Sequence, residues 1–370
     1  MKIRRIRIAR LEHPLDPPFF AAWDPVPRRS FAATLVRVET DDGVSGVGSG
    51  DTMDGFAAFE HLFLGQDPMR IARHVRALET INFHAGRSWP LEAALWDLVG
   101  KVTGQPVATL FGGALDGIPA YASTGERRSP GARAESALAI REAGFRAMKI
   151  RIDRHALAEG LATVRATREA VGDSMELMVD LNAAWRMAGD TSPALDVVSA
   201  RRVADELADL GVLWLEEPLD GADLRGLASL RAGGRIRVAG GEMTRSLPEI
   251  LAAMDADAFD VYQPDVVLAV GMLRARTVAE LALARNRWFS PHTWTNGIGL
   301  LANLHVAAGV GGGPYLEVPY DPPGWTPERR DFMLATPIAI DGEGRLLVPS
   351  SPGLGIELSD EAVRALDAAP

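Results

Sequence analysis

AMKIRID (residues 147–153) belongs to a series in which short apolar strands alternate with capped helices, and this alternation decides the fold. The helical stretch GLATVRATREAVG (160–172) follows it, and ELMVDLN (176–182) is again a short apolar strand. A second helix, SARRVADELADLG (199–211), leads to the strand VLWLEEP (212–218). Both helices end in glycine, as is common at a helix C-cap. This order of strands and helices predicts a parallel sheet with crossover helices.

The alternation extends outward in both directions from these units. Eight strands with helices between them fit a parallel barrel better than an open sheet, although periodicity alone does not exclude the open form. The eighth strand runs into non-helical sequence, which predicts a modified TIM barrel of the (β/α)7β type over residues 116–320. The eight strand candidates are IPAYAST (118–124), AMKIRI (147–152), ELMVDLN (176–182), VLWLEEP (212–218), RVAGGE (237–242), AFDVYQPD (258–265), NRWFSPH (286–292) and GPYLEVP (313–319).

The first part of the chain, residues 1–115, has a different pattern. Two segments with period-2 alternation, IRRIRIARLE (3–12) and FAATLVRVET (31–40), precede the turn signal DDG, and GVSGVGSG (43–50) then returns as a short glycine-rich strand. Helical stretches follow, the clearest being PLEAALWDLVGKVTG (90–104), with proline in its first turn and glycine at its C-cap. Strands and helices in separate blocks predict an α+β domain.

The last part of the chain, residues 321–370, begins with a proline-rich segment. It then contains the strand-like piece PIAIDGEGRLLVP (337–349) and a small helix, SDEAVRALDAA (359–369). We expect this segment to fold back onto the N-terminal α+β domain.

The composition limits the classes of partner. The chain has 370 residues, of which 47% are hydrophobic and 24% charged, and this is an ordinary balance for a globular protein. Its net charge of -10 argues against nucleic acid or an anionic membrane as a partner. It has no cysteine, which excludes disulfides and thiolate metal ligands. The N-terminus lacks the apolar core of a signal peptide, so we expect a cytoplasmic protein.

Polar or ionisable residues stand at the C-terminal ends of the predicted barrel strands. In barrels of this kind the active site lies at the rim that these ends form. A single carboxylate after a strand is most often a solvated loop charge, but here the residues recur one strand–helix unit apart. That coincidence predicts a site on one rim. The residues are Lys149, Arg151, Asp180, Asn182, Glu216, Glu217, Glu242, Asp265, His292 and Glu317.

Three carboxylates from adjacent strands, Asp180, Glu216 and Glu242, make a site in which every ligand is oxygen. Such ligands suit a hard cation, so we expect one Mg²⁺ ion, with open positions for water or substrate. Without a cation, clustered carboxylates raise one another's pKa and destabilise the fold. Lys149 and Arg151 point to one side of their strand, because side chains repeat every two residues, and they bring positive charge opposite the carboxylates.

A histidine and an aspartate are also placed to act together. His292 follows Asp265 by one unit, close enough for a hydrogen bond that fixes the imidazole tautomer and raises its basicity. Glu217 points away from its neighbour if the strand continues, and we expect a structural role for it. Asn182 fits a turn as readily as a site. His61, His74, His84 and His305 have no evident partner in the sequence and are expected to be structural, whereas His155 is expected to be exposed.

Eight short motifs follow one another along the chain, namely LEAALWDLVGKVTGQPVATLFGG (91–113), MKIR (148–151), VDLNAAW (179–185), LEEP (215–218), GGE (240–242), QPD (263–265), FSPH (289–292) and LEVPY (316–320). With these motifs in this order, the chain resembles the enolase superfamily, specifically its mandelate racemase-like subgroup. The resemblance covers nearly the full length and implies a capping domain over the barrel. It also implies that the proton α to a carboxylate is removed, giving an enediolate held on Mg²⁺, and that Asp180, Glu216 and Glu242 are the metal ligands.

The resemblance also implies catalytic roles. His292 with Asp265 matches the family's His–Asp general base, and Glu317 matches the eighth-strand acid that donates a hydrogen bond to the enediolate oxygen. Lys149 matches the first lysine of a Lys-x-Lys motif. Arg151 departs from that motif, since the second lysine is the usual base on the other face of the substrate and a guanidinium cannot readily accept a proton.

Specificity is expected from two loops of the capping domain, as in the family. The candidates are EHPLDPPFFAAWDPVPRRSF (12–31) and GSGDTMDGF (48–56). In the first loop, Trp23 either packs or walls the substrate pocket, and Arg28 is placed to meet a distal carboxylate of a diacid. Trp294, two residues after His292, has the same two interpretations as Trp23.

The arginine in place of the second lysine favours one-base chemistry, and we therefore predict a dehydratase of aldonic or aldaric acids that loses a β-hydroxyl. The partner is a small hydroxy-carboxylate. A racemase, epimerase or cycloisomerase of the same superfamily is the first alternative. A catalytically silent metal-binding barrel that acts as a binding protein is the second. The family resemblance further implies a homo-oligomer.

Overall fold

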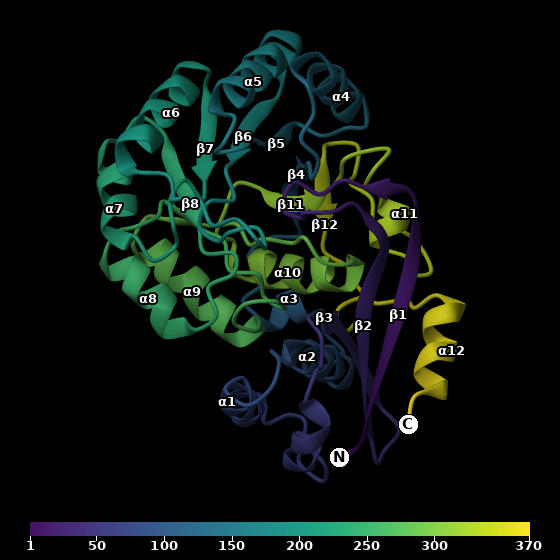
Figure 1. The fold of residues 1–370 in the computed structure, drawn as a ribbon. Helices are drawn as coiled ribbons and strands as arrows, with labels where there is room; N and C mark the ends of the chain where they lie inside the picture. The colour runs from purple at the N-terminus through teal and green to yellow at the C-terminus, as the bar shows by residue number, and fades with distance from the viewer.

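The computed structural model describes residues 1–370 as an N-terminal α+β domain beside a barrel of parallel strands (Figure 1). The N-terminal sheet is antiparallel, with its strands in chain order. Its strands are β1 (Ile3–Phe19), β2 (Arg28–Thr40) and β3 (Ser45–Gly50). The helices that follow are the 3-10 helix η1 (Phe56–Leu62), α1 (Ile71–Ile81), α2 (Trp89–Thr103) and α3 (Val107–Leu110).

Helix α2 packs closely against β3, and this contact explains the glycine-rich strand. A Cβ atom on Gly46 would overlap the backbone of Ala94, and a Cβ atom on Gly48 would overlap the backbone of Pro90. Only glycine therefore allows the helix to approach the strand this closely. The resulting core includes Leu91 and Leu95 of α2, both fully buried.

The barrel contains eight strands that pair in parallel, in the order β10-β9-β8-β7-β6-β5-β4-β11. The strands are β4 (Gly117–Ser123), β5 (Ala147–Arg151), β6 (Glu176–Asp180), β7 (Val212–Glu216), β8 (Arg237–Gly240), β9 (Val261–Tyr262), β10 (Trp288–Phe289) and β11 (Leu316–Pro319). The helices are α4 (Pro130–Glu142), α5 (Leu157–Val171), 3-10 helix η2 (Gly172–Ser174), α6 (Val197–Asp209), α7 (Leu224–Ala232), α8 (Leu247–Asp255), α9 (Met272–Ala284) and α10 (Gly297–Val310). The predicted fold class, a (β/α)7β barrel with an N-terminal α+β domain, is confirmed.

The seam between β10 and β11 has no regular ladder of backbone hydrogen bonds. The backbone N–H of Phe289 donates to the carbonyl of Gly312 at 2.9 Å, and the Ser290 hydroxyl donates to the carbonyl of Tyr315 at 2.8 Å. These bonds hold the last two strands together, although β9 and β10 are only two residues long.

The C-terminal segment joins both parts of the molecule. Strand β12 (Arg345–Leu347) pairs antiparallel with β4, after the short helix α11 (Pro327–Arg330). Helix α12 (Asp360–Ala368) lies against β1 and β2 (Figure 1), where its Ala362 and Leu366 are buried.

The α+β domain is also fixed to the barrel by buried side chains of α2. The Glu92 carboxylate accepts hydrogen bonds from the backbone N–H groups of Met272 and Leu273, at 3.0 and 2.8 Å, and so caps the start of α9. The Trp89 indole donates to the carbonyl of Ala269 at 3.0 Å. None of the helices combines the length and apolar character needed to cross a membrane.

The structure differs from the sequence-based expectation in the first loop. Strand β1 continues to Phe19 and β2 begins at Arg28, so the connection between them is shorter than the predicted loop 12–31. The ring of Phe19 is fully buried and packs against Trp294 and Trp325, which lie far away in the sequence. This aromatic packing extends the strand through a segment that contains three prolines.

Candidate active site

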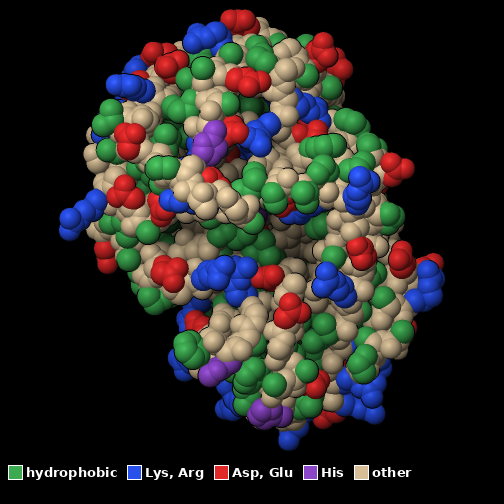
Figure 2. Space-filling view, viewed as in Figure 1, with side chains coloured by type: hydrophobic (Ala, Val, Ile, Leu, Met, Phe, Trp, Pro, Cys, Tyr) green, Lys and Arg blue, Asp and Glu red, His purple; other side chains and the backbone are tan.

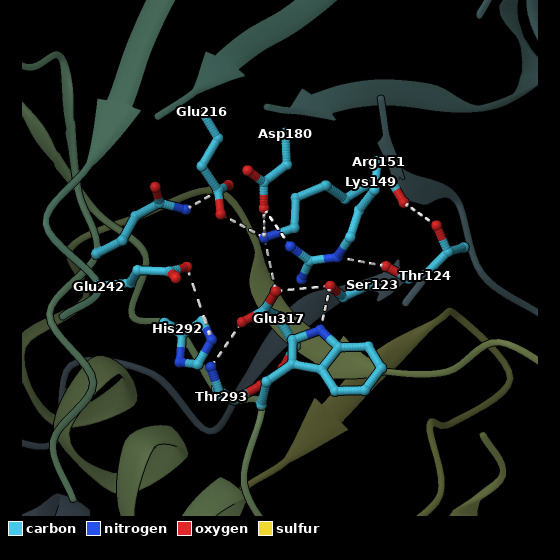
Figure 3. A network of polar contacts seen from close by, with 12 residues as sticks. Ser123, Thr124, Lys149, Arg151, Asp180, Glu216, Glu242, His292, Thr293 and Glu317 are labelled. Carbon is cyan, nitrogen blue, oxygen red and sulfur yellow. Dashed lines mark hydrogen bonds and ion pairs between the residues drawn. The ribbon is translucent and has the colours of Figure 1, made fainter. Parts of the chain in front are cut away.

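The inward-facing side chains of the barrel form two layers. The lower layer is an apolar cluster that includes Ala147, Met178, Trp214 and Val261. Two residues further along the same strands, with the same facing, stand Lys149, Asp180, Glu216 and Gln263, because side chains alternate along a strand. The apolar layer therefore supports a polar layer at the C-terminal ends of the strands, where barrel enzymes place their active sites. Figure 3 shows the polar contacts among the side chains at this end.

Asp180, Glu216 and Glu242 come together as one cluster. One carboxylate oxygen from each lies within 4.8 Å of the others, and all three residues are buried. The Trp214 indole and the Gln263 amide hold Glu216, at 3.1 and 2.9 Å.

The donor set of this cluster fits one Mg²⁺ ion. All three ligands are oxygens, as Mg²⁺ prefers. Oε2 of Glu242 is buried without a hydrogen-bond partner. Burial, with the charges of Asp180 and Glu317, raises the pKa of Glu216 to about 8 against the opposing effect of Lys149. A divalent cation removes this electrostatic penalty, so the cluster is consistent with a magnesium site.

Lys149 lies beneath the carboxylates and is completely buried. Its ammonium contacts Glu216 at 2.5 Å, Glu317 at 2.8 Å and Asp180 at 3.5 Å. Burial lowers the pKa of Lys149, but these carboxylates outweigh it and hold the pKa well above the ordinary value. Lys149 is therefore a fixed cation in this arrangement.

Arg151 stands above Lys149 on the same strand. Its Nη1 donates to Asp180 and to Asn182, both at 2.6 Å, and its Nε donates to the carbonyl of Thr124 at 2.9 Å. Its guanidinium lies over the ring of Trp23, 4.4 Å from the ring centre. Asn182 has a φ of 45°, so it is a turn residue and also directs its side chain to this arginine.

His292 and Asp265 form a hydrogen-bonded pair on the opposite side. Nδ1 of His292 lies 3.0 Å from Oδ2 of Asp265, and Nε2 lies 3.7 Å from Glu242. Oδ1 of Asp265 accepts from the backbone N–H groups of Val267 and Leu268, at 2.8 and 3.1 Å. Burial lowers the pKa of His292, but Glu242, Glu317 and Asp265 outweigh burial and raise it to about 9 in the metal-free site. A cation held by Glu242 would offset the largest of these charges and favour the neutral imidazole.

Glu317 connects the two sides of the site (Figure 3). Its carboxylate accepts hydrogen bonds from the Ser123 hydroxyl at 2.7 Å and from the Thr293 backbone N–H at 2.6 Å, and it contacts Lys149. Although burial opposes it, the positive charges of Lys149 and His292 lower the pKa of Glu317 to about 2. Glu317 is thus an acceptor here, and the hydrogen-bond donor role that the family resemblance implies stays a prediction.

A cavity of about 560 Å³ opens above these groups, between the barrel rim and the α+β domain. Figure 2 shows this face hollowed between the two parts of the molecule. Arg151, Glu242 and His292 line the cavity, whereas Lys149 does not. The four residues predicted to bind substrate all line it, and they are Trp23, Arg28, Asn182 and Trp294.

All four of these residues also make contacts within the protein, and those of Asn182 with Arg151 are described above. The Trp294 indole donates to Ser123 at 2.7 Å, and its ring lies 4.7 Å from that of Trp23, so these residues both pack and wall the cavity. Arg28 forms an ion pair with Asp24, which neutralises its charge.

Several residues that line the cavity were not named as site residues from the sequence. Asp51 falls within the second predicted specificity loop, and Trp185 ends the VDLNAAW motif, where its indole donates to Glu242 at 3.0 Å. Arg87, Arg245 and Leu268 have no local sequence signal, because tertiary structure alone brings them to the cavity. Glu217 lies outside this cavity, in a left-handed conformation with φ of 46°, and its buried Oε2 has no hydrogen-bond partner.

The rim of this capped (β/α)7β barrel carries clustered carboxylates, a buried lysine and a His–Asp pair. These features define a class of barrel enzymes that combine a metal site with acid–base catalysis. The family models agree with this description. Residues 132–362 match the enolase C-terminal domain-like family, and residues 3–112 match the N-terminal domain of the mandelate racemase / muconate lactonizing enzyme family. The chain therefore belongs to the mandelate racemase / muconate lactonizing enzyme family of the enolase superfamily.

Individual relatives cover nearly the whole chain. It is 32% identical to D-galactarolactone cycloisomerase from Agrobacterium fabrum, over 98% of each chain. It is 28% identical to L-talarate/galactarate dehydratase from Salmonella typhimurium, over 91% of this chain and 83% of the relative. A racemase from Streptomyces coelicolor, solved with bound magnesium, has a TM-score of 0.83 and 29% identity, over 98% of this chain and 99% of the other. Relatives thus include acid-sugar dehydratases and isomerases.

Proposed function

We propose that this protein is a Mg²⁺-dependent acid-sugar dehydratase in which His292 removes the proton α to a carboxylate. The observation that carries the proposal is the asymmetry of the cavity, since His292 lines one side and the β5 side chain that lines it is Arg151. A guanidinium stays protonated and cannot accept a proton. Racemisation through bases on both faces would need a base on β5, and the cavity presents none there.

Lys149 is a poor substitute for that second base. Its ammonium is buried beneath three carboxylates and does not reach the cavity surface. Glu317, which is not one of the metal-ligand candidates, lies 2.8 Å from this ammonium and stabilises its charged form. In this proposal Lys149 and Arg151 hold positive charge near the substrate carboxylate.

The proposed reaction needs no other reactant. Nε2 of His292 takes the α-proton, and the electron pair of the C–H bond moves toward the substrate carboxylate. When bound, Mg²⁺ supplies positive charge that stabilises this carboxylate as it gains electrons. The pair then forms a double bond between the α- and β-carbons as the β-C–O bond breaks, and the leaving hydroxide takes the proton from His292 to give water. The enol product becomes a 2-keto acid.

A cycloisomerase is the second candidate, because the cycloisomerase relative matches more of this chain, at higher identity, than the dehydratase relative does. Such an enzyme forms or opens a ring and keeps all the atoms of its substrate. The same proton removal by His292 serves both reactions, so the cavity geometry alone supports either.

A screen of aldonic acids, aldaric acids and their lactones with Mg²⁺ tests the proposal. Formation of a 2-keto acid with loss of one water supports the dehydratase, and an isomer in which a ring has opened or closed supports the cycloisomerase. Solvent deuterium at the α-carbon without either product would indicate a racemase or epimerase. Binding without any reaction would indicate a silent binding protein. The His292→Asn variant is the control and should be inactive.

Three further expectations from the sequence stay predictions. They are a cytoplasmic location, a homo-oligomeric state and the domain boundaries at residues 1–115, 116–320 and 321–370.

A further inference from the structure

The charges that line the active-site cavity are unevenly paired. Four arginines line it, and three of them have a carboxylate partner, as follows: Arg28 with Asp24, Arg87 with Asp51 at 2.7 Å, and Arg151 with Asp180 at 2.6 Å. The guanidinium of Arg245 has neither an ion pair nor a hydrogen bond within the protein. Arg245 is therefore the uncompensated cation of this cavity.

The backbone of Arg245 is nevertheless held in place. It lies three residues after Glu242, in the loop between β8 and α8. Its backbone N–H donates to the side chain of Glu249 at 3.2 Å, while the Ser246 side chain accepts from the backbone of Glu249 at 3.4 Å. This reciprocal capping of α8 fixes the position from which the long side chain reaches the cavity.

Arg245 also stands where the cavity meets the outside. A second cleft of about 910 Å³ runs between the α+β domain and the barrel, and Asp51, Arg87 and Arg245 line both spaces. Basic side chains are visible on both sides of the hollow in Figure 2. Arg151, Glu242 and His292 come from the barrel strand ends, whereas Arg87 and the exposed Arg245 lie where the two spaces meet.

We infer that Arg245 binds a second, distal carboxylate of the substrate, so that this enzyme acts on dicarboxylic rather than monocarboxylic acid sugars. This inference rests on the proposed function, which places the reacting carboxylate beside Lys149, Arg151 and the carboxylate cluster. An unpaired guanidinium gains two charge-assisted hydrogen bonds from a carboxylate, which a terminal hydroxyl cannot supply. Arg87 contributes less net charge, because Asp51 already balances it.

Matched pairs of ligands test the inference. We would measure the binding of galactarate against galactonate, and of glucarate against gluconate, to the His292→Asn protein with Mg²⁺ by calorimetry. We expect the diacid of at least one pair to bind about 10- to 100-fold more tightly, and Arg245→Gln to remove that preference while Mg²⁺ affinity is unchanged. Arg225→Gln is the matched control, since Arg225 is exposed on α7 and lines none of these spaces.

Equal binding of diacid and monoacid in both pairs, no binding of any of the four, or equal weakening of both acids by Arg245→Gln, would overturn the inference. Turnover by the wild-type protein separates this result from the proposed function. Dehydration of monoacids without diacid preference refutes the distal site alone. A preserved diacid preference without any turnover refutes the dehydratase and leaves the binding site supported.

Discussion

Replacing Asp265 by asparagine should reverse the tautomer of His292 and abolish its action as a base. In the wild-type protein Oδ2 of Asp265 accepts the Nδ1 proton of His292, which leaves Nε2 free to take a proton. In Asp265→Asn an amide N–H group facing His292 would donate to Nδ1 instead. The proton would then sit on Nε2, the atom that must accept one.

The orientation of the introduced amide follows from the backbone. The other oxygen of Asp265 accepts the N–H groups of Val267 and Leu268, at 2.8 and 3.1 Å, and Asn303 lies 3.4 Å away. An amide nitrogen placed there would face donors and leave buried N–H groups without acceptors, at about 1–3 kcal/mol each. The amide oxygen therefore occupies that position, and the amide nitrogen faces His292.

The expected loss is large. The same change in a serine-protease triad lowers kcat by about 10⁴-fold through the same tautomer reversal. We expect kcat to decrease by about 10³- to 10⁴-fold, which is equivalent to a rise of about 4–5.5 kcal/mol in the activation free energy. The measurements are kcat for the acid sugar found by the screen and the rate of solvent deuterium incorporation at its α-carbon.

Asp260→Asn is the matched control, because Asp260 precedes β9 at the opposite end of the strand and bonds to Arg231 and the backbone of Val238. It should lower stability and leave kcat nearly unchanged. The double variant Asp265→Asn/His292→Asn should be no slower than His292→Asn alone, since both changes remove the same function, the base. A kcat for Asp265→Asn within 10-fold of wild type would refute the reasoning about the tautomer.

Three further predictions concern metal affinity and stability. Trp185→Phe removes the hydrogen bond that orients Glu242 and should weaken Mg²⁺ binding about 10- to 100-fold by calorimetry; unchanged affinity would contradict this. Burial lowers the pKa of His305 to about 4, below its value of 6.5 in the unfolded chain. The free energy of unfolding should therefore be highest above pH 6.5 and fall by about 3 kcal/mol as the pH decreases toward 4. Urea unfolding at pH 7.5 and 4.5 should show a smaller loss in His305→Gln, and an equal loss would exclude this cause. Gly271→Ala, at φ of 81° with the Glu92 carboxylate in the way, should lower the melting temperature, whereas Gly342→Ala, in open space, should not.

The barrel and its polar rim were accessible from the sequence because both depend on local periodicity. Two-residue alternation places Lys149 and Asp180 one step above the apolar layer, and each strand–helix unit repeats this placement. The pairing of His292 with Asp265 follows from their spacing of one strand–helix unit, since the ends of neighbouring parallel strands meet at one edge.

The cavity wall was less accessible because its members meet only through tertiary structure. Arg28 was expected to be free for a distal carboxylate, but it pairs with Asp24 within its own loop. Arg245 carries no sequence signal beyond its position after a metal-ligand candidate. The extension of β1 to Phe19 was missed because prolines suggested a loop, although an edge strand tolerates proline and distant aromatic rings stabilise this one.

The path of the C-terminal segment constrains how such proteins can be assembled and recombined. Arg7 of β1 donates to the carbonyl of Ala369 at 2.7 Å, and Asp97 of α2 accepts from the backbone of Leu354 at 2.8 Å. The surface of the α+β domain is thus completed by a segment that follows the barrel in the chain. A single crossover between two genes cannot exchange the whole α+β domain, because the exchanged domain would meet a foreign C-terminal segment. Grafting a new specificity onto this barrel requires two junctions, one before β4 and one after β11.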